Sequence, residues 1–303
     1  MRWYSLLPFY SSLKKEKNME ENIKTRRTVN IDSDLLEVLI IEYRDNNLSL
    51  RKIQEKYNVN RHKVAKILEE RGIKTTKGNH YRYNLHDFDY FEIIDSHAKA
   101  YFLGLLMADG YITDNSKRYG EDNFGISLQI DDLPIIKSLK KHLKATNDIK
   151  TYTEYKGYSK DGGSTYARLT LSSQKTVDDL IDKGVVKQKT LIKSFPSSNK
   201  VPEEFIYSYL RGYMDGNGSI VLRKTKTQGL KGELSFTTSE CFAKGLERFG
   251  ECSIYKDKRA NAWCVCFYNK SSMKILNKMY EHSTEDTRIK RKYNKYLKIK
   301  DDE

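Results

Sequence analysis

The chain contains little cysteine or proline and no long hydrophobic run. Its 303 residues include 4 cysteines, 4 prolines and 17 glycines. Four cysteines in a chain of this length exclude a disulfide scaffold, and so few prolines exclude collagen-like and proline-rich architectures. No apolar run approaches the ~18 residues of a membrane span, and residues 1–22 lack the small-residue cleavage site of a secretory signal. We therefore expect a soluble protein of a reducing compartment.

Positive charge is in excess along the whole chain. There are 55 Lys and Arg against 41 Asp and Glu, a net charge of +14 with a pI near 9.3. The excess is +3 over residues 1–95, +5 over 96–202 and +6 over 203–303. This spread favours a polyanionic partner, most simply nucleic acid, over the alternative of general solubility. Because 22 Tyr and 11 Phe accompany the charge, we expect folded domains, about two for this length.

Residues 32–72 have the spacing of three short helices, with polar residues placed to cap each one. Two helices joined by a short turn, with cations at the start of the second, are typical of a helix-turn-helix. We predict such a DNA-binding domain at 32–75, after an extension (1–31) that need not be ordered and before a linker (76–95). An ordinary three-helix bundle with a solvated cationic face is the alternative. The predicted DNA contacts are Arg61, His62, Lys63 and Lys66.

The rest of the chain contains an internal repeat. Residues 100–112 (AYFLGLLMADGYI) and 206–220 (IYSYLRGYMDGNGSI) each begin with an apolar helical pattern that leads into a polar, Gly-containing segment. Each is followed by strand-like alternation, an amphipathic helix, two more strands and a closing helix. The order helix-strand-strand-helix-strand-strand-helix therefore occurs twice. We predict a mixed α/β fold of two related halves, 96–200 and 201–303.

The two repeat starts resemble the signature motifs of a known family. FLGLLMADG at 102–110 and LRGYMDGNG at 210–218 resemble the two motifs of single-chain LAGLIDADG homing endonucleases, and residues 90–112 are similar to phage- and intron-encoded members. The resemblance covers about residues 95–300. It implies a saddle-like domain of two pseudo-twofold-related αββαββα halves. It also implies a monomer that recognises a long, specific double-stranded DNA target and hydrolyses it with Mg²⁺.

The motif residues have a physical logic of their own. Gly104 and Gly212 lack side chains that would keep two helices apart, and Gly110 and Gly218 can end those helices through a left-handed residue. Carboxylates at the foot of paired helices can bind Mg²⁺, which activates water and stabilises the leaving oxygen of a phosphodiester. A solvated turn acid is the alternative for the first motif's carboxylate. The metal ligands that the resemblance implies are Asp109, Asn217, Ala108 and Gly216.

The second motif departs from the family pattern. Asp109 occupies the position of the first catalytic acid, but Asn217 stands where the second acid is expected, and Asp215 fills the motif's other acidic position. Asparagine keeps a carbonyl oxygen but removes one negative charge, so we expect weaker metal binding and slower or strand-biased cleavage. Three interpretations follow: a degenerate copy that only binds DNA, a natural variant with weakened cleavage, or a deliberate inactivation.

The resemblance also implies a basic residue from each half near the reacting water. VVKQKTL (185–191) and RIKRKYNKYL (288–297) resemble the family's closing segments, which makes Lys189 and Lys290 or Lys292 candidates; simple phosphate contacts are the alternative. Gln129, at a strand end, is either a polar member of the site or a base reader. The predicted catalytic residues are Asp109, Asn217, Lys189, Lys292 and Gln129.

Exposed sides of the strands are the predicted base readers. A sheet with one face packed on helices leaves alternate residues free to enter the major groove, where Arg-to-guanine contacts are the commonest specific ones. A merely solvated sheet face is the alternative. The predicted contacts in the two halves are Arg168, Tyr166, Lys150, Arg223, Thr225, Ser235, Thr237 and Lys256.

Two functions of other classes stay open. One is a non-catalytic, sequence-specific DNA-binding regulator on the same core, which Asn217 favours. The other is an intron maturase that assists RNA splicing. We expect no membrane partner. The expected setting is a mobile genetic element in the cytoplasm of a bacterial or phage-infected cell, with an organelle as the alternative.

Overall fold

The computed structural model describes residues 29–44, 48–73, 75, 86–114, 122–155, 163–185, 193–225, 229–258 and 261–302. The chain divides into two compact units, unit 1 (Met1–Tyr83) and unit 2 (Asn84–Glu303). Each unit has its own hydrophobic core, so each is described by itself. None of the helices in the described ranges is long and apolar enough to cross a membrane.

Unit 1 contains three helices where the apolar spacing predicts them: α2 (Ser33–Arg44), α3 (Leu50–Tyr57) and α4 (Arg61–Glu70). The Ser49 side chain caps α3 and the Asn60 side chain caps α4, each by accepting backbone N–H groups of the first turn. Between them Asn58 adopts a left-handed conformation, with φ of 49°. The core that joins the helices consists of Leu39, Tyr43, Ile53, Val59, Val64 and Leu68.

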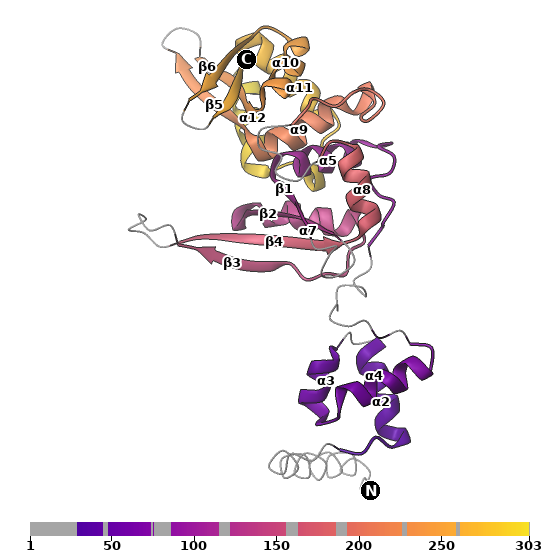
Figure 1. Ribbon diagram of the computed structural model, residues 1–303. Coiled ribbons are helices and arrows are strands. Elements are labelled where there is room, and N and C mark those ends of the chain that lie inside the picture. The colour runs from indigo at the N-terminus through magenta and orange to yellow at the C-terminus, as the bar shows by residue number, and fades with distance from the viewer. Residues whose placement is uncertain are drawn as a thin grey trace, which may run out of the picture. The chain divides into compact units, whose positions relative to one another are not determined.

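Unit 2 contains the duplicated order that the sequence predicts (Figure 1). Half 1 consists of α5 (His97–Asp109), β1 (Gly110–Thr113), β2 (Asn123–Gln129), η2 (Ile130–Asp132), α7 (Leu133–His142), β3 (Lys150–Glu154), β4 (Ser164–Ser172) and α8 (Gln174–Asp182). Half 2 consists of η3 (Glu203–Phe205), α9 (Ile206–Asn217), β5 (Gly218–Thr225), β6 (Gly229–Thr238), α10 (Glu240–Leu246), η4 (Glu247–Phe249), β7 (Cys252–Asp257), β8 (Ala262–Tyr268) and α11 (Asn269–Glu281). It is followed by η5 (Glu285–Thr287) and α12 (Lys290–Lys300).

Each half forms one four-stranded antiparallel sheet, in the order β1-β2-β4-β3 and β5-β6-β8-β7. Along the strands, apolar residues such as Phe124, Ile126 and Leu169 are buried on one face, against the helices. The alternate residues form the opposite face, as the period of two requires. Figure 1 shows α5 and α9 between the two sheets.

The two motif helices pack against each other without side chains at their closest points. A Cβ on Gly104 would overlap the carbonyl oxygen of Tyr209 on α9, and a Cβ on Gly212 would overlap that of Tyr101 on α5. The predicted role of these two glycines is therefore confirmed. The neighbouring residues of both helices are buried, so the helix pair forms the centre of the unit 2 core.

The glycines that end the helices do so differently from the prediction. Gly110 has φ of −66° and Gly218 has φ of −124°, so neither is left-handed, and each is the first residue of a strand. They are required for space instead. A Cβ on Gly110 would lie 2.5 Å from the carbonyl oxygen of Leu106, and one on Gly218 would lie 2.8 Å from that of Ser235.

Residues 86–95 belong to unit 2, contrary to the predicted linker. Tyr90, Phe91 and Ile94 are buried in the core that contains the motif helices. The N–H of Asp87 donates to the carbonyl of Leu143 at 2.7 Å. These few apolar residues lack strand or helix periodicity, so only their packing identifies them as core.

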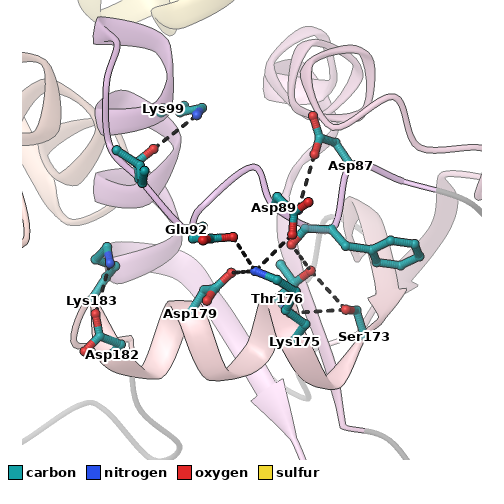
Figure 2. Close-up of polar contacts among 12 residues, drawn as sticks. Asp87, Asp89, Glu92, Lys99, Ser173, Lys175, Thr176, Asp179, Asp182 and Lys183 are labelled. Atoms are coloured by element: carbon teal, nitrogen blue, oxygen red, sulfur yellow. Dashed lines mark hydrogen bonds and ion pairs between the residues drawn. The ribbon is translucent and has the colours of Figure 1, made fainter.

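Polar contacts fasten the same segment to α8 (Figure 2). Lys175 Nζ lies 3.0 Å from Asp89 Oδ1, 2.7 Å from Glu92 Oε2 and 3.1 Å from Asp179 Oδ2. The Thr176 hydroxyl, one residue further, donates to the backbone carbonyl of Phe88 at 3.1 Å. Residues 86–95 therefore form a strap across the start of α8.

His86 is the first described residue of this strap and is buried, with 6% of its surface exposed. Its Nε2 lies 3.2 Å from Thr176 Oγ1, and its ring contacts Phe88 and Phe124. Nδ1 has no hydrogen-bond partner among the described residues. Burial lowers the pKa of His86 to about 4, so the ring is neutral in the folded protein at pH 7.

We predict that Gly212→Ala destabilises unit 2 by about 3 kcal/mol, because the added methyl must push the two helix backbones apart. Denaturant unfolding measures the change. The control is Lys274→Ala on the exposed side of α11, which should change stability by less than about 0.5 kcal/mol. Equal stability of Gly212→Ala and the wild type would contradict the close packing.

We predict that His86 makes stability fall as the pH falls from 6.5 to 4. In that window the unfolded chain binds a proton that the folded ring does not, because the folded pKa of His86 is depressed to about 4. His86→Phe should therefore lose about 3 kcal/mol less than the wild type between pH 7 and pH 4, measured by denaturant unfolding of unit 2. His62→Gln, in the other unit, is the control. An identical pH dependence in His86→Phe would refute the prediction.

Candidate nuclease site

The predicted acid and its asparagine counterpart meet at the ends of the two motif helices. Asp109 is the last residue of α5 and Asn217 is the last residue of α9. The Asn217 side-chain amide donates to the carbonyl of Ala108 at 3.3 Å. A Cβ on Gly216 would lie 2.9 Å from Asp109 Oδ2, so the carboxylate lies against the backbone of the second motif. The structure therefore brings together the four residues predicted as metal ligands.

A buried lysine from each half is bound to these helix ends. In half 2, Lys292 Nζ donates to the carbonyls of Met214 (2.6 Å), Asp215 (2.8 Å) and Gly218 (2.7 Å). In half 1, Lys193 Nζ donates to the carbonyl of Ala108 at 3.3 Å. Both lysines are 5% exposed.

Lys292 was a predicted site residue, but Lys193 was missed. The predicted Lys189 lies outside the described residues. Lys193 belongs to the same lysine-containing segment, four positions later, where its charge follows two apolar residues. The sequence holds several lysines here, and only the tertiary structure distinguishes the buried one. Lys290, the alternative to Lys292, is exposed on α12.

The two lysines have similar electrostatics. Burial lowers the pKa of Lys193 to about 8, and the nearby Asp109 carboxylate opposes the shift. Burial likewise lowers the pKa of Lys292 to about 8, opposed first by Asp215 and more weakly by Asp109. Each ammonium group can therefore hold or release a proton close to neutral pH.

The donor set suits one hard divalent cation that is shared with a substrate. The helix ends offer the Asp109 carboxylate, the Asn217 amide oxygen and main-chain carbonyls, and oxygen atoms are the ligands that Mg²⁺ and Ca²⁺ prefer. No group of three or more His, Cys, Asp or Glu that could hold a metal occurs in the described ranges. Because Mg²⁺ is commonly held by one or two carboxylates plus substrate phosphates, a single carboxylate fits an ion that binds with DNA.

The exposed face of the half 1 sheet has an organised cationic cluster. Arg168 Nη2 donates to the Tyr152 hydroxyl at 2.7 Å, and the guanidinium lies 4.4 Å from the centre of that ring. Tyr152 stacks on Tyr166, and Lys150 is paired opposite Arg168 in the sheet. The predicted readers Lys150, Tyr166 and Arg168 therefore share one face.

Gln129 lies on this face rather than beside Asp109. It is paired opposite Tyr166 in the sheet, while Ile126 is the partner of Gly110, the residue after Asp109. Gln129 is three residues from Ile126 along β2, a separation of about 10 Å. This placement favours the base-reading alternative for Gln129.

The corresponding face of half 2 differs in charge. Arg223 forms an ion pair with Glu233 at 2.5 Å, and Ser235 and Thr237 follow on the same face. The prediction for Lys256 was wrong. Its register partner is Trp263, which is paired with the buried Thr238, so these three residues lie on the helix-facing side of the sheet. Lys256 therefore does not share the exposed face with Ser235 and Thr237. The side chain of Thr225 lies outside the described residues.

Unit 1 presents its predicted cations at the surface of α4. Arg61, His62, Lys63 and Lys66 are all exposed. Lys63 Nζ donates to Asn30 Oδ1 at 3.3 Å, and Lys66 pairs with Glu70 at 3.9 Å. Such exposed contacts hold side chains weakly, so Arg61, Lys63 and Lys66 are accessible to a polyanion.

Comparison with known proteins now identifies the motif. Residues 96–183, which run from the N-cap of α5 into the turn after α8, match the family model described as a LAGLIDADG-like domain. These residues are therefore similar to a LAGLIDADG-like domain. No curated protein matches the sequence.

Solved structures are similar to a larger share of the chain. The homing endonuclease I-WcaI, bound to its DNA recognition sequence, has a TM-score of 0.50 and 16% identity over 69% of this chain and 91% of its own. I-SmaMI, bound to uncleaved DNA in the presence of calcium ions, has a TM-score of 0.40 and 16% identity over 65% and 87%. The homing endonuclease I-GzeII in complex with its DNA target has a TM-score of 0.36 and 13% identity over 67% and 87%. The likeness to I-WcaI shows a shared fold.

Proposed function

We propose that the protein is a site-specific endonuclease that binds a long double-stranded DNA target and hydrolyses phosphodiester bonds with Mg²⁺. The observation that carries the proposal is the cluster at the ends of α5 and α9. Asp109, Asn217 and one buried lysine from each half meet where the LAGLIDADG-like domain contacts its repeat. The DNA-bound state of I-WcaI, which has the same fold, supports DNA as the substrate.

The residues of the cluster have separate roles in this proposal. Asp109, the amide oxygen of Asn217 and the carbonyl of Gly216 would hold the cation, whereas the carbonyl of Ala108 already accepts Lys193 and the Asn217 amide. The bound ion supplies a Lewis acid and lowers the pKa of a water molecule. Lys193 and Lys292 hold positive charge at the two helix ends, where it stabilises the charge that develops on the phosphate. Asn217 contributes no negative charge, so cleavage on its side is slower.

The two sheets are the proposed base-reading surfaces. Arg168 is held by Tyr152 with its guanidinium already ordered, which suits bidentate contact with guanine in the major groove. Arg223 is neutralised by Glu233 and must give up that ion pair to do the same. We therefore propose that half 1 makes the stronger guanine contact. Unit 1 adds a helix-turn-helix contact through α4, with its first turn in the major groove.

One rival function has support from a specific observation. Asn217 donates its amide to Ala108 and cannot donate a negative charge to a metal site, so a regulator that binds DNA without cutting it is the second candidate. It would use the same sheet faces. Only the cleavage step separates the two.

A strand-resolved cleavage assay tests the proposal. The chain is used to select bound duplexes from a random DNA library, and the selected site is cloned into a supercoiled plasmid. With Mg²⁺ we expect slow nicking and linearisation, none in EDTA, and a rate about tenfold higher for Asn217→Asp, which restores the second carboxylate. Asp109→Asn should lower the rate by at least about 100-fold and leave DNA affinity within about threefold.

Two outcomes of this assay would contradict the proposed nuclease function. Tight binding without cleavage by either the wild type or Asn217→Asp would favour the regulator. Cleavage that Asp109→Asn does not affect would place the chemistry elsewhere in the chain.

The role of unit 1 predicts a change in salt dependence. In the full chain, Arg61→Ala, Lys63→Ala and Lys66→Ala together should make the negative slope of log K against log [salt] shallower by about 3, because three phosphate contacts are lost. The matched control removes three exposed cations of α11, with Lys270→Ala, Lys274→Ala and Lys278→Ala. The same slope in both triple variants would exclude α4 from the DNA contact.

A further inference from the structure

Asp215 is the acid of the second motif that the proposed chemistry does not use. It is 2% exposed, within the interface of the two motif helices. Its Oδ2 accepts the Tyr101 hydroxyl of α5 at 2.8 Å and the backbone N–H of Ile289 at 3.0 Å. Oδ1 has no hydrogen-bond partner among the described residues. A buried carboxylate is costly, so its specific partners indicate what it is there for.

The Ile289 contact connects Asp215 to Lys292. Ile289 is the N-cap of α12, and Lys292 lies in the first turn of that helix. The Lys292 side chain returns to α9, where one of its three acceptors is the backbone carbonyl of Asp215 itself. Asp215 and Lys292 therefore close a ring of contacts: the carboxylate holds the start of α12, and the ammonium group that α12 carries is held at the end of α9.

Arg211, one turn earlier on α9, holds the segment just before Ile289. Its Nε donates to the carbonyl of Thr287 at 2.9 Å, its Nη2 donates to the Thr287 hydroxyl at 3.4 Å, and its Nη1 donates to the carbonyl of Met279. Arg211 is fully buried. Two charged residues four positions apart on one helix thus bind Thr287, the last residue of η5, and Ile289, the N-cap of α12.

Half 1 has no equivalent of this arrangement in its motif. Leu103 and Met107 stand where half 2 has Arg211 and Asp215, because the two motifs are related by a shift of 108 residues. The Nζ of Lys193, the lysine of half 1, donates one hydrogen bond to a described residue, at 3.3 Å, whereas the Nζ of Lys292 donates three, at 2.6 to 2.8 Å. The lysine of half 2 is therefore held more tightly than the lysine of half 1.

We propose that Asp215 is a positioning residue that fixes Lys292 at the end of the second motif helix. The half that lacks the second catalytic acid thereby keeps a rigid cation in the site. The catalytic meaning of this arrangement rests on the proposed nuclease function, but the positioning itself does not.

Chemical labelling of lysines tests the positioning without DNA. The full chain is treated with an acetylating N-hydroxysuccinimide ester, and the rates at Lys292 and Lys193 are followed by peptide mass spectrometry. In Asp215→Leu we expect Lys292 to react about tenfold faster than in the wild type, with Lys193 within about twofold. Asp215→Asn should stay within about threefold, because its amide oxygen can accept both hydrogen bonds.

Two further variants separate the contacts of Asp215. Ile289→Pro removes the N–H that Asp215 binds at a position with φ of −78°, which proline tolerates, so Lys292 should again react about tenfold faster. Because it leaves Asp215 in place, this variant also tests the proposal where Asp215→Leu fails to fold. Tyr101→Phe removes the other donor and is the matched control, with Lys292 within about threefold.

The outcomes are decisive in both directions. Selective acceleration of Lys292 in Asp215→Leu or Ile289→Pro supports the positioning role. Unchanged protection of Lys292, or equal acceleration of Lys193, overturns it, since a general structural role would loosen both halves.

Cleavage kinetics then separate this proposal from the proposed function. On the selected target, Asp215→Leu should lower the single-turnover rate about tenfold at unchanged affinity, and the double variant with Lys292→Met should be no slower than Lys292→Met alone. Independent, additive losses would overturn the catalytic part of the inference. Selective labelling in a chain that never cleaves DNA would instead uphold the positioning and reject the nuclease function.

Discussion

The close packing of α5 against α9 is the constraint on which the rest of unit 2 depends. Gly104 and Gly212 leave no room for a Cβ, so the helix backbones touch and the two helices end side by side. That contact brings Asp109 to the backbone of Gly216 and Asn217 to the carbonyl of Ala108. In each half, the chain passes directly from the end of the motif helix into the first strand of the sheet. One interface therefore places both the helix-end site and the two exposed sheet faces.

The two halves share a fold but not a charge pattern. Half 1 supplies the carboxylate Asp109 and an ordered cation, Arg168, on its sheet. Half 2 supplies a neutral Asn217 and an arginine paired with Glu233, while its buried charges, Arg211 and Asp215, hold the helix that carries a lysine. The duplication has thus diverged on the sheet faces and at the helix ends. It has also diverged inside the helix pair, where Arg211 and Asp215 replace Leu103 and Met107.

Much of the fold could be predicted from the sequence, because helix and strand periodicity repeat in the same order and the motifs are local. The errors came from contacts that local periodicity does not show. The strap at 86–95 has too few apolar residues for a periodic pattern, so the burial of Tyr90, Phe91 and Ile94 was not predictable. Lys256 was assigned to the wrong face because face depends on register, which was known only from its pairing with Trp263. Lys193 could not be selected among neighbouring lysines.

The sequence by itself determined the duplicated architecture, the glycines of the helix interface, the position of Asp109 and the loss of its counterpart at Asn217. These features are encoded in short motifs whose physical consequences are local. The tertiary structure decided which lysines enter the site and what Asp215 binds. Those answers depend on Lys193, 85 residues from Ala108, and on Ile289, 74 residues from Asp215. Such contacts depend on how whole elements pack, and burial then selects among side chains that are chemically alike.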